Sequence, residues 1–203
     1  MWKAIKKIFN SVNSTHTKNE DNNNVDVFGV DNSFQNSSLD ELFATNFNSG
    51  GGHFLYCENK NEAIHNLNQI IKFENSSKLI CVDPYLQNIL EKIETEYTIN
   101  PNEIPQGFSF LKCEFLCAFD GSIMISAHQT AGRKVEEFPL NFIIWATPTQ
   151  FANNLSDGLQ KLKSLKKDNL PSNITCIRGK DMHSFSSIPN AKNIYLLLVD
   201  NLS

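Results

Sequence analysis

The sequence predicts a single α/β domain built on a largely parallel sheet with flanking helices. From Leu39 onward, short apolar segments typical of strands alternate with segments whose apolar residues recur at helical spacing. The strand-like segments, such as residues 142–146 and 194–199, are apolar at consecutive positions, which indicates strands covered on both faces. Helices that connect such strands favour parallel pairing between them.

The first elements of this domain are bounded by recognisable helix signals. Residues 39–47 predict a short helix that ends at three consecutive glycines, residues 50–52. A strand is expected at residues 54–57. Asn59 then begins a helix, with Glu62 as its capping-box partner.

The next strand is expected at residues 78–82. Asp83 and Pro84 follow it as the N-cap and first residue of another helix.

Further along, residues 115–119 and 122–126 predict a β-hairpin. Asp120-Gly121 between these apolar runs is typical of a type I′ turn, in which both central residues have positive φ. A strand follows at residues 142–146, and Thr147-Pro148 is expected to begin a helix with Phe151 and Leu155 on its buried side. The last strands are expected at residues 174–177 and 194–199.

Residues 1–36 differ from the rest of the chain. Apolar residues from Trp2 to Val12 fall at helical spacing with lysines between them, which fits a short amphipathic helix that contacts a membrane surface or a partner. The Asn-rich residues 13–36 instead favour a flexible tail. We therefore expect a tail at residues 1–36, in which that helix remains an alternative, and one domain at residues 37–203.

Length and composition fit a soluble, cytoplasmic protein. The 203 residues suffice for one sizeable core, and the contents of 40% hydrophobic and 20% charged residues are ordinary. The net charge of −4 gives no support to nucleic-acid binding, and no apolar run is long enough to be a transmembrane segment.

The five cysteines are odd in number, widely spaced and embedded in apolar segments, without a C-x-x-C motif. Cys113 and Cys117 would share one strand face but lie roughly 13 Å apart, too far to bind one metal ion. We therefore expect reduced, buried cysteines and no cofactor or metal within this chain.

The candidate site lies around the Asp-Gly turn. Asp120, Gly121 and Ser122 offer a carboxylate, a hydroxyl and backbone N–H groups at a strand end, a set that suits a small anion or carbonyl, although the same residues also make ordinary tight turns. Gln129 and Arg133 follow in a polar segment, where Arg133 either pairs with a ligand carboxylate or is solvated. His128 and His183 lie in loops on either side.

Motifs of catalysis are absent from the sequence. There is no Gly-x-Ser-x-Gly elbow, no His-x-x-x-His pair and no Rossmann glycine fingerprint. The glycines at residues 50–52 lie between a helix and a strand and are followed by no Lys-Ser/Thr, so they do not form a phosphate-binding loop.

Residues 39–202 resemble the LUD domain, the lactate utilisation protein B/C family, most closely at residues 113–162. The family has Ala-Glu-Thr-Gly-Thr after an apolar strand, and residues 118–122 stand in that place as Ala-Phe-Asp-Gly-Ser. An arginine, a proline and a buried strand leading into a helix match Arg133, Pro139 and residues 142–146. The closing apolar strand before an acidic residue matches residues 195–199 and Asp200.

The resemblance implies a NagB/RpiA/CoA-transferase-like fold and a link to the oxidation of L-lactate by a complex whose iron–sulfur clusters belong to other subunits. Two departures stand out. Phe119 replaces the family's glutamate, and residues 179–184 keep only the glycine of the family's Gly-Pro-Ser-Arg-Thr-Ala-Asp-Ile-Glu segment.

We expect a ligand-binding or accessory subunit that works with iron–sulfur oxidoreductase subunits and takes a small carboxylate or phosphate-bearing ligand. Its ligand-binding residues are expected to be Asp120, Gly121, Ser122, Gln129, Arg133 and His183. The alternatives are a small-molecule enzyme of the isomerase or CoA-transferase type that uses Asp120 and His183, and a non-catalytic interaction module recruited through the N-terminus.

Overall fold

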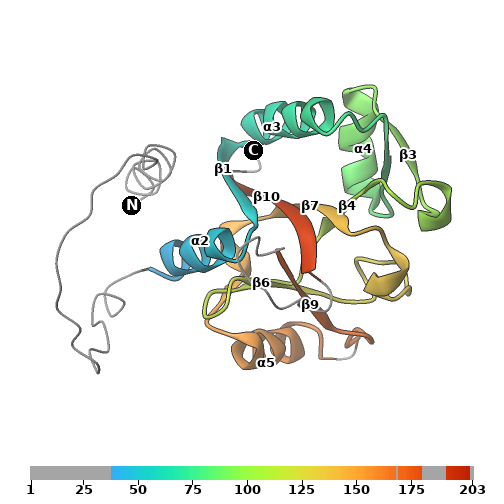
Figure 1. Cartoon of the computed structure of the whole chain (residues 1–203). Coiled ribbons are helices and arrows are strands. Elements are labelled where there is room, and N and C mark those ends of the chain that lie inside the picture. Colours follow the sequence, from blue (N-terminus) through green and yellow to red (C-terminus); the bar gives the residue numbers. More distant parts are fainter. Residues whose placement is uncertain (1–37, 168, 180–190, 202–203) are drawn as a thin grey trace, which may run out of the picture.

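The computed structural model describes residues 38–167, 169–179 and 191–201, so the expected N-terminal tail and His183 lie outside the described residues. The described chain alternates helices and strands around a sheet (Figure 1). In chain order these are α2 (Leu39–Ser49), β1 (His53–Asn59), α3 (Lys60–Phe73), β2 (Lys78–Ile80), α4 (Pro84–Lys92), β3 (Glu96–Thr98), η2 (Pro101–Glu103), β4 (Phe108–Lys112), β5 (Phe115–Cys117), β6 (Ser122–Ile125), η3 (Val135–Glu137), β7 (Asn141–Ala146), η4 (Pro148–Gln150), β8 (Phe151–Ala152), α5 (Leu155–Leu165), β9 (Thr175–Gly179) and β10 (Ala191–Asn201).

The described strands form a ten-stranded sheet in the order β3-β2-β4-β7-β10-β9-β6-β5-β8, and β1 also pairs with β10. All pairs are parallel except β5 with β6 and β6 with β9. The long strand β10 joins the two parts, because its first residues pair with β9 and the following residues pair with β7 and β1. The prediction of a largely parallel α/β sheet is confirmed.

The apolar strands are covered on both faces, as their sequence predicts. Along β10, Leu196 and Leu198 pack in one cluster with Phe43 and Phe47 of α2. Leu197 and Val199 point to the other face, into the cluster that holds residues of α3 and α4. Figure 1 shows α3 and α4 on one side of the strands and α5 beyond β6 and β9 on the other.

The helix termini follow the expected signals. The Asn59 side chain accepts a hydrogen bond from the Glu62 N–H at 3.0 Å, and Asp83 Oδ1 accepts from the Tyr85 N–H at 2.9 Å and the Leu86 N–H at 3.1 Å. Helix α2 ends at the glycines, where the Gly52 N–H donates to the Phe47 carbonyl at 2.9 Å and Gly51 has a φ of 78°.

The helix expected from Thr147 begins later than predicted. Residues 148–150 form a single 3₁₀ turn, and Phe151 lies in β8, paired with Leu116, rather than on a helix face. The Gln150 side chain donates to the Cys113 carbonyl at 2.5 Å, which ties the turn to the segment before β5. Asn154 caps α5 by accepting from the Asp157 N–H at 3.0 Å.

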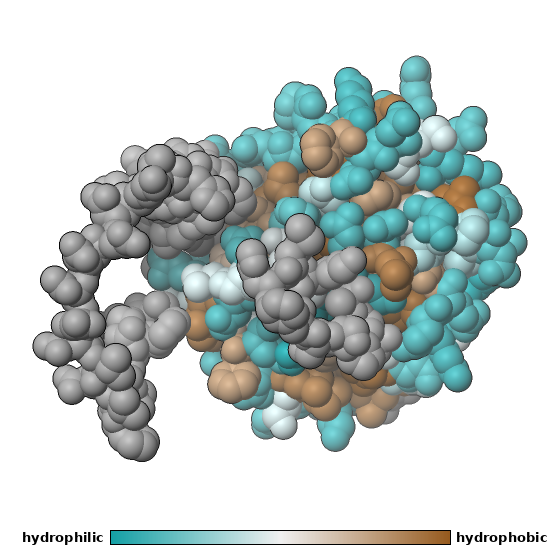
Figure 2. Space-filling model, in the orientation of Figure 1, coloured by the Kyte–Doolittle hydropathy of each residue, from teal (hydrophilic) through white to brown (hydrophobic). Residues whose placement is uncertain are grey.

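The surface seen in Figure 2 mixes hydrophilic residues with scattered hydrophobic ones. Among the described residues, no helix combines the length and the apolar character needed to cross a membrane.

Candidate functional site

The predicted hairpin is present, but its turn differs from the expected type. Cys117 of β5 pairs with Ser122 of β6, so four residues rather than two connect the strands. Gly121 has a φ of 64°, whereas Asp120 is not among the residues with positive φ, so the prediction of a type I′ turn is wrong. The Asp120 carboxylate instead folds back onto the strand and accepts hydrogen bonds from the Ser122 N–H at 3.1 Å and the Ser122 hydroxyl at 2.7 Å.

The turn is fixed against the C-terminal end of α2. The Asn46 side chain donates to the carbonyls of Ala118 at 2.8 Å and Phe119 at 3.1 Å. A Cβ atom at Gly121 would lie 2.5 Å from the Phe47 backbone nitrogen, so this position requires glycine for space as well as for its positive φ. Phe119, which replaces the family's glutamate, is 76% exposed.

Strand β9 adds a charged partner that was not among the predicted site residues. Arg178 forms an ion pair with Asp120 Oδ2, and its side chain is 52% exposed. The next residue, Gly179, packs against the glycine loop after α2, since a Cβ there would lie 2.5 Å from the Gly52 nitrogen. We call Asp120, Ser122 and Arg178 the turn cluster; it presents a carboxylate and a guanidinium, both held by well-packed backbone.

Two thiols lie beside the turn cluster, on the same face of the strands. The five cysteines are free, and Cys176 is half-buried while the others are buried. A hydrogen bond between the thiols raises the pKa of Cys117 and lowers the pKa of Cys176. Strands β5 and β9 are separated by β6, which places the two Cα atoms roughly 10 Å apart, beyond the range of a disulfide.

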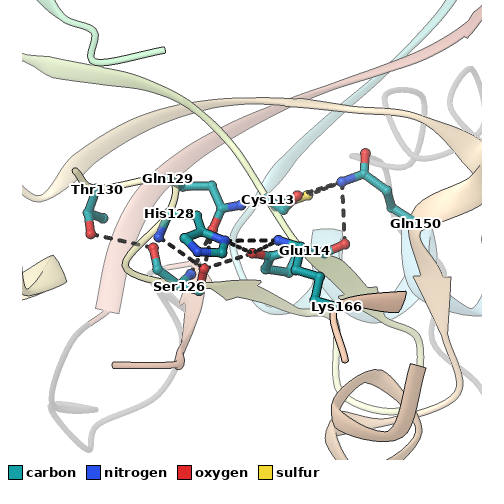
Figure 3. Close-up of polar contacts among 8 residues, drawn as sticks. All are labelled: Cys113, Glu114, Ser126, His128, Gln129, Thr130, Gln150 and Lys166. Atoms are coloured by element: carbon teal, nitrogen blue, oxygen red, sulfur yellow. Dashed lines mark hydrogen bonds and ion pairs between the residues drawn. The ribbon is translucent and has the colours of Figure 1, made fainter. Parts of the chain in front are cut away.

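A second polar cluster lies at the other end of β6 (Figure 3). We call Glu114, Ser126, His128, Gln129 and Lys166 the Glu114 cluster. The buried Glu114 Oε1 accepts from the Ser126 hydroxyl at 2.7 Å and from Lys166 Nζ at 2.8 Å. Gln129 Oε1 accepts from the Ser126 N–H at 2.8 Å, and His128 Nδ1 lies 3.1 Å from Lys166 Nζ.

The electrostatics of this cluster favour an ionised carboxylate. Burial would raise the pKa of the Glu114 carboxyl, but the hydrogen bonds from Lys166 and Ser126 outweigh it, so the pKa is lowered. The side chains of Lys166 and His128 are 31% and 37% exposed and lie over the Glu114 carboxylate, whose side chain is 7% exposed. The ion pair ties the end of α5 to the segment between β4 and β5.

The structure therefore divides the predicted site residues between two places. Asp120, Gly121 and Ser122 lie together at the turn, while Gln129 belongs to the Glu114 cluster. The four residues of β6 put roughly 13 Å between Ser122 and Ser126. Arg133 is half-buried beyond the Gln129 turn, where its carbonyl accepts from the Thr130 hydroxyl at 2.6 Å.

Arg178, Glu114 and Lys166 are site residues that the sequence did not predict. Arg178 directly follows an apolar strand and precedes Gly179, the glycine kept from the family's segment, so its position in the sequence could have indicated it. Glu114 and Lys166 are 52 residues apart, and nothing in their local sequence indicates that they pair.

Comparisons with known proteins agree with the fold. No family model matches the chain, and no curated protein matches its sequence. Among solved structures, the crystal structure of a DUF162 family protein from Deinococcus radiodurans is similar, with a TM-score of 0.58 and 10% sequence identity. The match covers 79% of this chain and 96% of that chain, and it shows a shared α/β fold.

Proposed function

We propose that this chain is a divergent LUD-domain protein that binds a small 2-hydroxy carboxylate, such as lactate, at the turn cluster. The observation that carries the proposal is the half-exposed Arg178 guanidinium, held beside Asp120 by a turn that packs tightly on α2. The structural similarity to a DUF162 protein supports the family assignment, because DUF162 is the LUD-domain-like family.

The two charged groups match the two polar groups of a hydroxy acid. A guanidinium has five N–H donors, so Arg178 can bind a ligand carboxylate while it still contacts Asp120. The Asp120 carboxylate accepts hydrogen bonds only, and it suits the hydroxyl on the neighbouring ligand carbon. Ser122 contributes by holding Asp120 in place through its N–H and its hydroxyl.

The chain has two arginines, Arg178 and Arg133, and replacing each with glutamine tests the site. Arg178→Gln should weaken lactate binding in isothermal titration by about tenfold or more, because a charge-assisted contact contributes about 1.5–3 kcal/mol. Arg133→Gln should bind as the wild type does. Arg178→Gln should also fold normally, since an exposed ion pair contributes about 0–1 kcal/mol.

If Arg133→Gln weakens lactate binding and Arg178→Gln does not, the ligand lies near Gln129 and Arg133, and the assignment of Arg178 is wrong. If lactate, pyruvate and related acids all leave the melting temperature unchanged at saturation, the proposal is wrong, because a ligand at 100 times its Kd stabilises the folded state by about 2.7 kcal/mol.

Within this proposal the chain acts as an accessory subunit, and iron–sulfur partner subunits carry the electrons from lactate. Affinity purification of the tagged chain from its native cells should co-isolate a protein with iron–sulfur absorption and lactate-dependent dye reduction. A tagged chain that purifies without lactate-oxidising activity would contradict the accessory role and leave the ligand-binding proposal to be judged by titration.

A further inference from the structure

A pocket of about 180 Å³ is lined by Tyr85, Lys112, Trp145, Thr147 and Gln150, none of which belongs to the turn cluster or the Glu114 cluster. Lys112 is the last residue of β4 and is paired with Trp145 of β7 in the parallel register. Tyr85 belongs to the first turn of α4, and Thr147 comes directly after β7. The pocket therefore lies at the carboxyl ends of the parallel strands.

The strand order makes this edge a favourable place for a ligand. Strands β2 and β4 are neighbours, and the chain leaves them in opposite directions: from β2 through α4 to β3 on one side, and from β4 to β5 on the other. Open α/β sheets bind ligands in the crevice outside the carboxyl ends of strands at such a switch point. Residues from the chain after β2 and from the end of β4 both line the pocket.

The pocket combines aromatic walls with hydrogen-bond donors. The rings of Tyr85 and Trp145 lie edge to face, with centroids 6.3 Å apart at 71°. Trp145 is 3% exposed, and its indole N–H is a hydrogen-bond donor. The ammonium of Lys112 is a further donor, and neither an ammonium nor an indole N–H can accept a hydrogen bond.

The local charge favours an anion. Nζ of Lys112 and Nζ of Lys60 each lie 4.7 Å from the centroid of the Tyr85 ring. Asp83 is the nearby carboxylate, and both of its oxygens are engaged, Oδ1 by the first N–H groups of α4 and Oδ2 by Lys112 at 3.0 Å. Among the five residues that line the pocket, Lys112 is the charged one, so the lining itself carries a positive charge.

We propose that this pocket binds a small aromatic carboxylate, with its ring against Tyr85 and Trp145 and its carboxylate at the Lys112 ammonium and the Trp145 N–H. The size of the pocket sets the ligand class, since a protein cavity of about 150 Å³ takes up benzene. One six-membered ring with one carboxylate fits, whereas larger ligands need about 300–1,000 Å³. Benzoate is the probe.

Trp145 itself reports binding. Its fluorescence can be followed without interference in a Trp2→Phe background, because the chain has two tryptophans. Benzoate should change the emission saturably in this protein, and benzyl alcohol, which keeps the ring and loses the charge, should bind at least about tenfold more weakly.

Lys112→Met should weaken benzoate binding by about tenfold or more, since it removes the ammonium and keeps the apolar stem. Lys60→Met is the matched control. It removes the other ammonium beside Tyr85, but Lys60 does not line the pocket, so this variant should change the Kd by less than about threefold. No saturable response to benzoate, equal binding of benzyl alcohol, or equal losses in the two variants would overturn the proposal. The ligand comparison uses the Trp2→Phe protein with the pocket intact, so it decides the question even if Lys112→Met fails to fold. Lactate titration of Arg178→Gln is independent of these outcomes.

Discussion

Comparing Gly121, which lies in the turn, with Gly132, which lies in the loop after β6, measures how closely the turn packs on α2. Gly121 has a φ of 64° and Gly132 a φ of 82°, so alanine is strained at both positions. They differ in space: a Cβ at Gly121 would lie 2.5 Å from the Phe47 nitrogen, whereas a Cβ at Gly132 would meet nothing within 4 Å.

Replacing each glycine with alanine should therefore give unequal losses of unfolding free energy. Gly132→Ala should cost about 1 kcal/mol, because the left-handed conformation costs an alanine about 1–2 kcal/mol and the stiffer unfolded chain offsets part of it. Gly121→Ala adds a clash with backbone atoms of α2, which cannot rotate away, and overpacking of this kind costs about 1–3 kcal/mol more.

Urea denaturation of the two variants and the wild type measures these losses, with equal slopes confirming that the same surface is exposed on unfolding. We expect Gly121→Ala to be the less stable variant by about 1–3 kcal/mol. Losses that agree within about 0.5 kcal/mol would refute the close packing of the turn on α2, since only the shared φ strain would remain.

Three further predictions concern Lys166, Cys176 and Ser109. Lys166→Met should lower the free energy of unfolding by about 1–2 kcal/mol at about pH 7, measured by urea denaturation. Because the pKa of Glu114 is lowered in the folded state, the ion pair stabilises fully above the usual glutamate pKa and less as the pH falls. A loss that does not change with pH would contradict the pairing. Cys176 should react first with iodoacetamide at neutral pH, because its pKa is lowered while that of Cys117 is raised, and mass spectrometry should find the label there. Ser109→Ala should be neutral or stabilising by up to about 1 kcal/mol, because the buried Ser109 hydroxyl has no partner among the described residues, and a clear thermal destabilisation would show that it has one.

The sequence predicts the central parallel strands well because their signal is local. Strands β7 and β10 are apolar at consecutive positions and are buried on both faces, and residues 54–57 of β1 are apolar and pack into both core clusters. The helices after β1 and β2 begin at side-chain caps that the sequence displays. Strands β3 and β4 were not predicted. Strand β3, Glu-Tyr-Thr, contains residues that favour strands, but three residues are too few to show a periodic pattern, and the strand is held by its pairing with β2.

The composition of the candidate site was only partly predictable. The Asp-Gly pair indicates a turn but not its length, which is decided by Asn46 of α2 and by the bonds from Ser122 to Asp120. The ion pair of Asp120 with Arg178 spans 58 residues, and the pairing of β6 with β9 creates it. Such a contact depends on sheet topology, which a local pattern does not contain.

A crystal structure of the chain soaked with L-lactate would show whether the turn cluster binds this ligand. We expect a bound lactate whose carboxylate contacts the Arg178 guanidinium and whose hydroxyl donates to Asp120, at ordinary hydrogen-bond distances. Lactate bound near Arg133 and Gln129, or a turn cluster that stays empty at a saturating concentration established by titration, would contradict it.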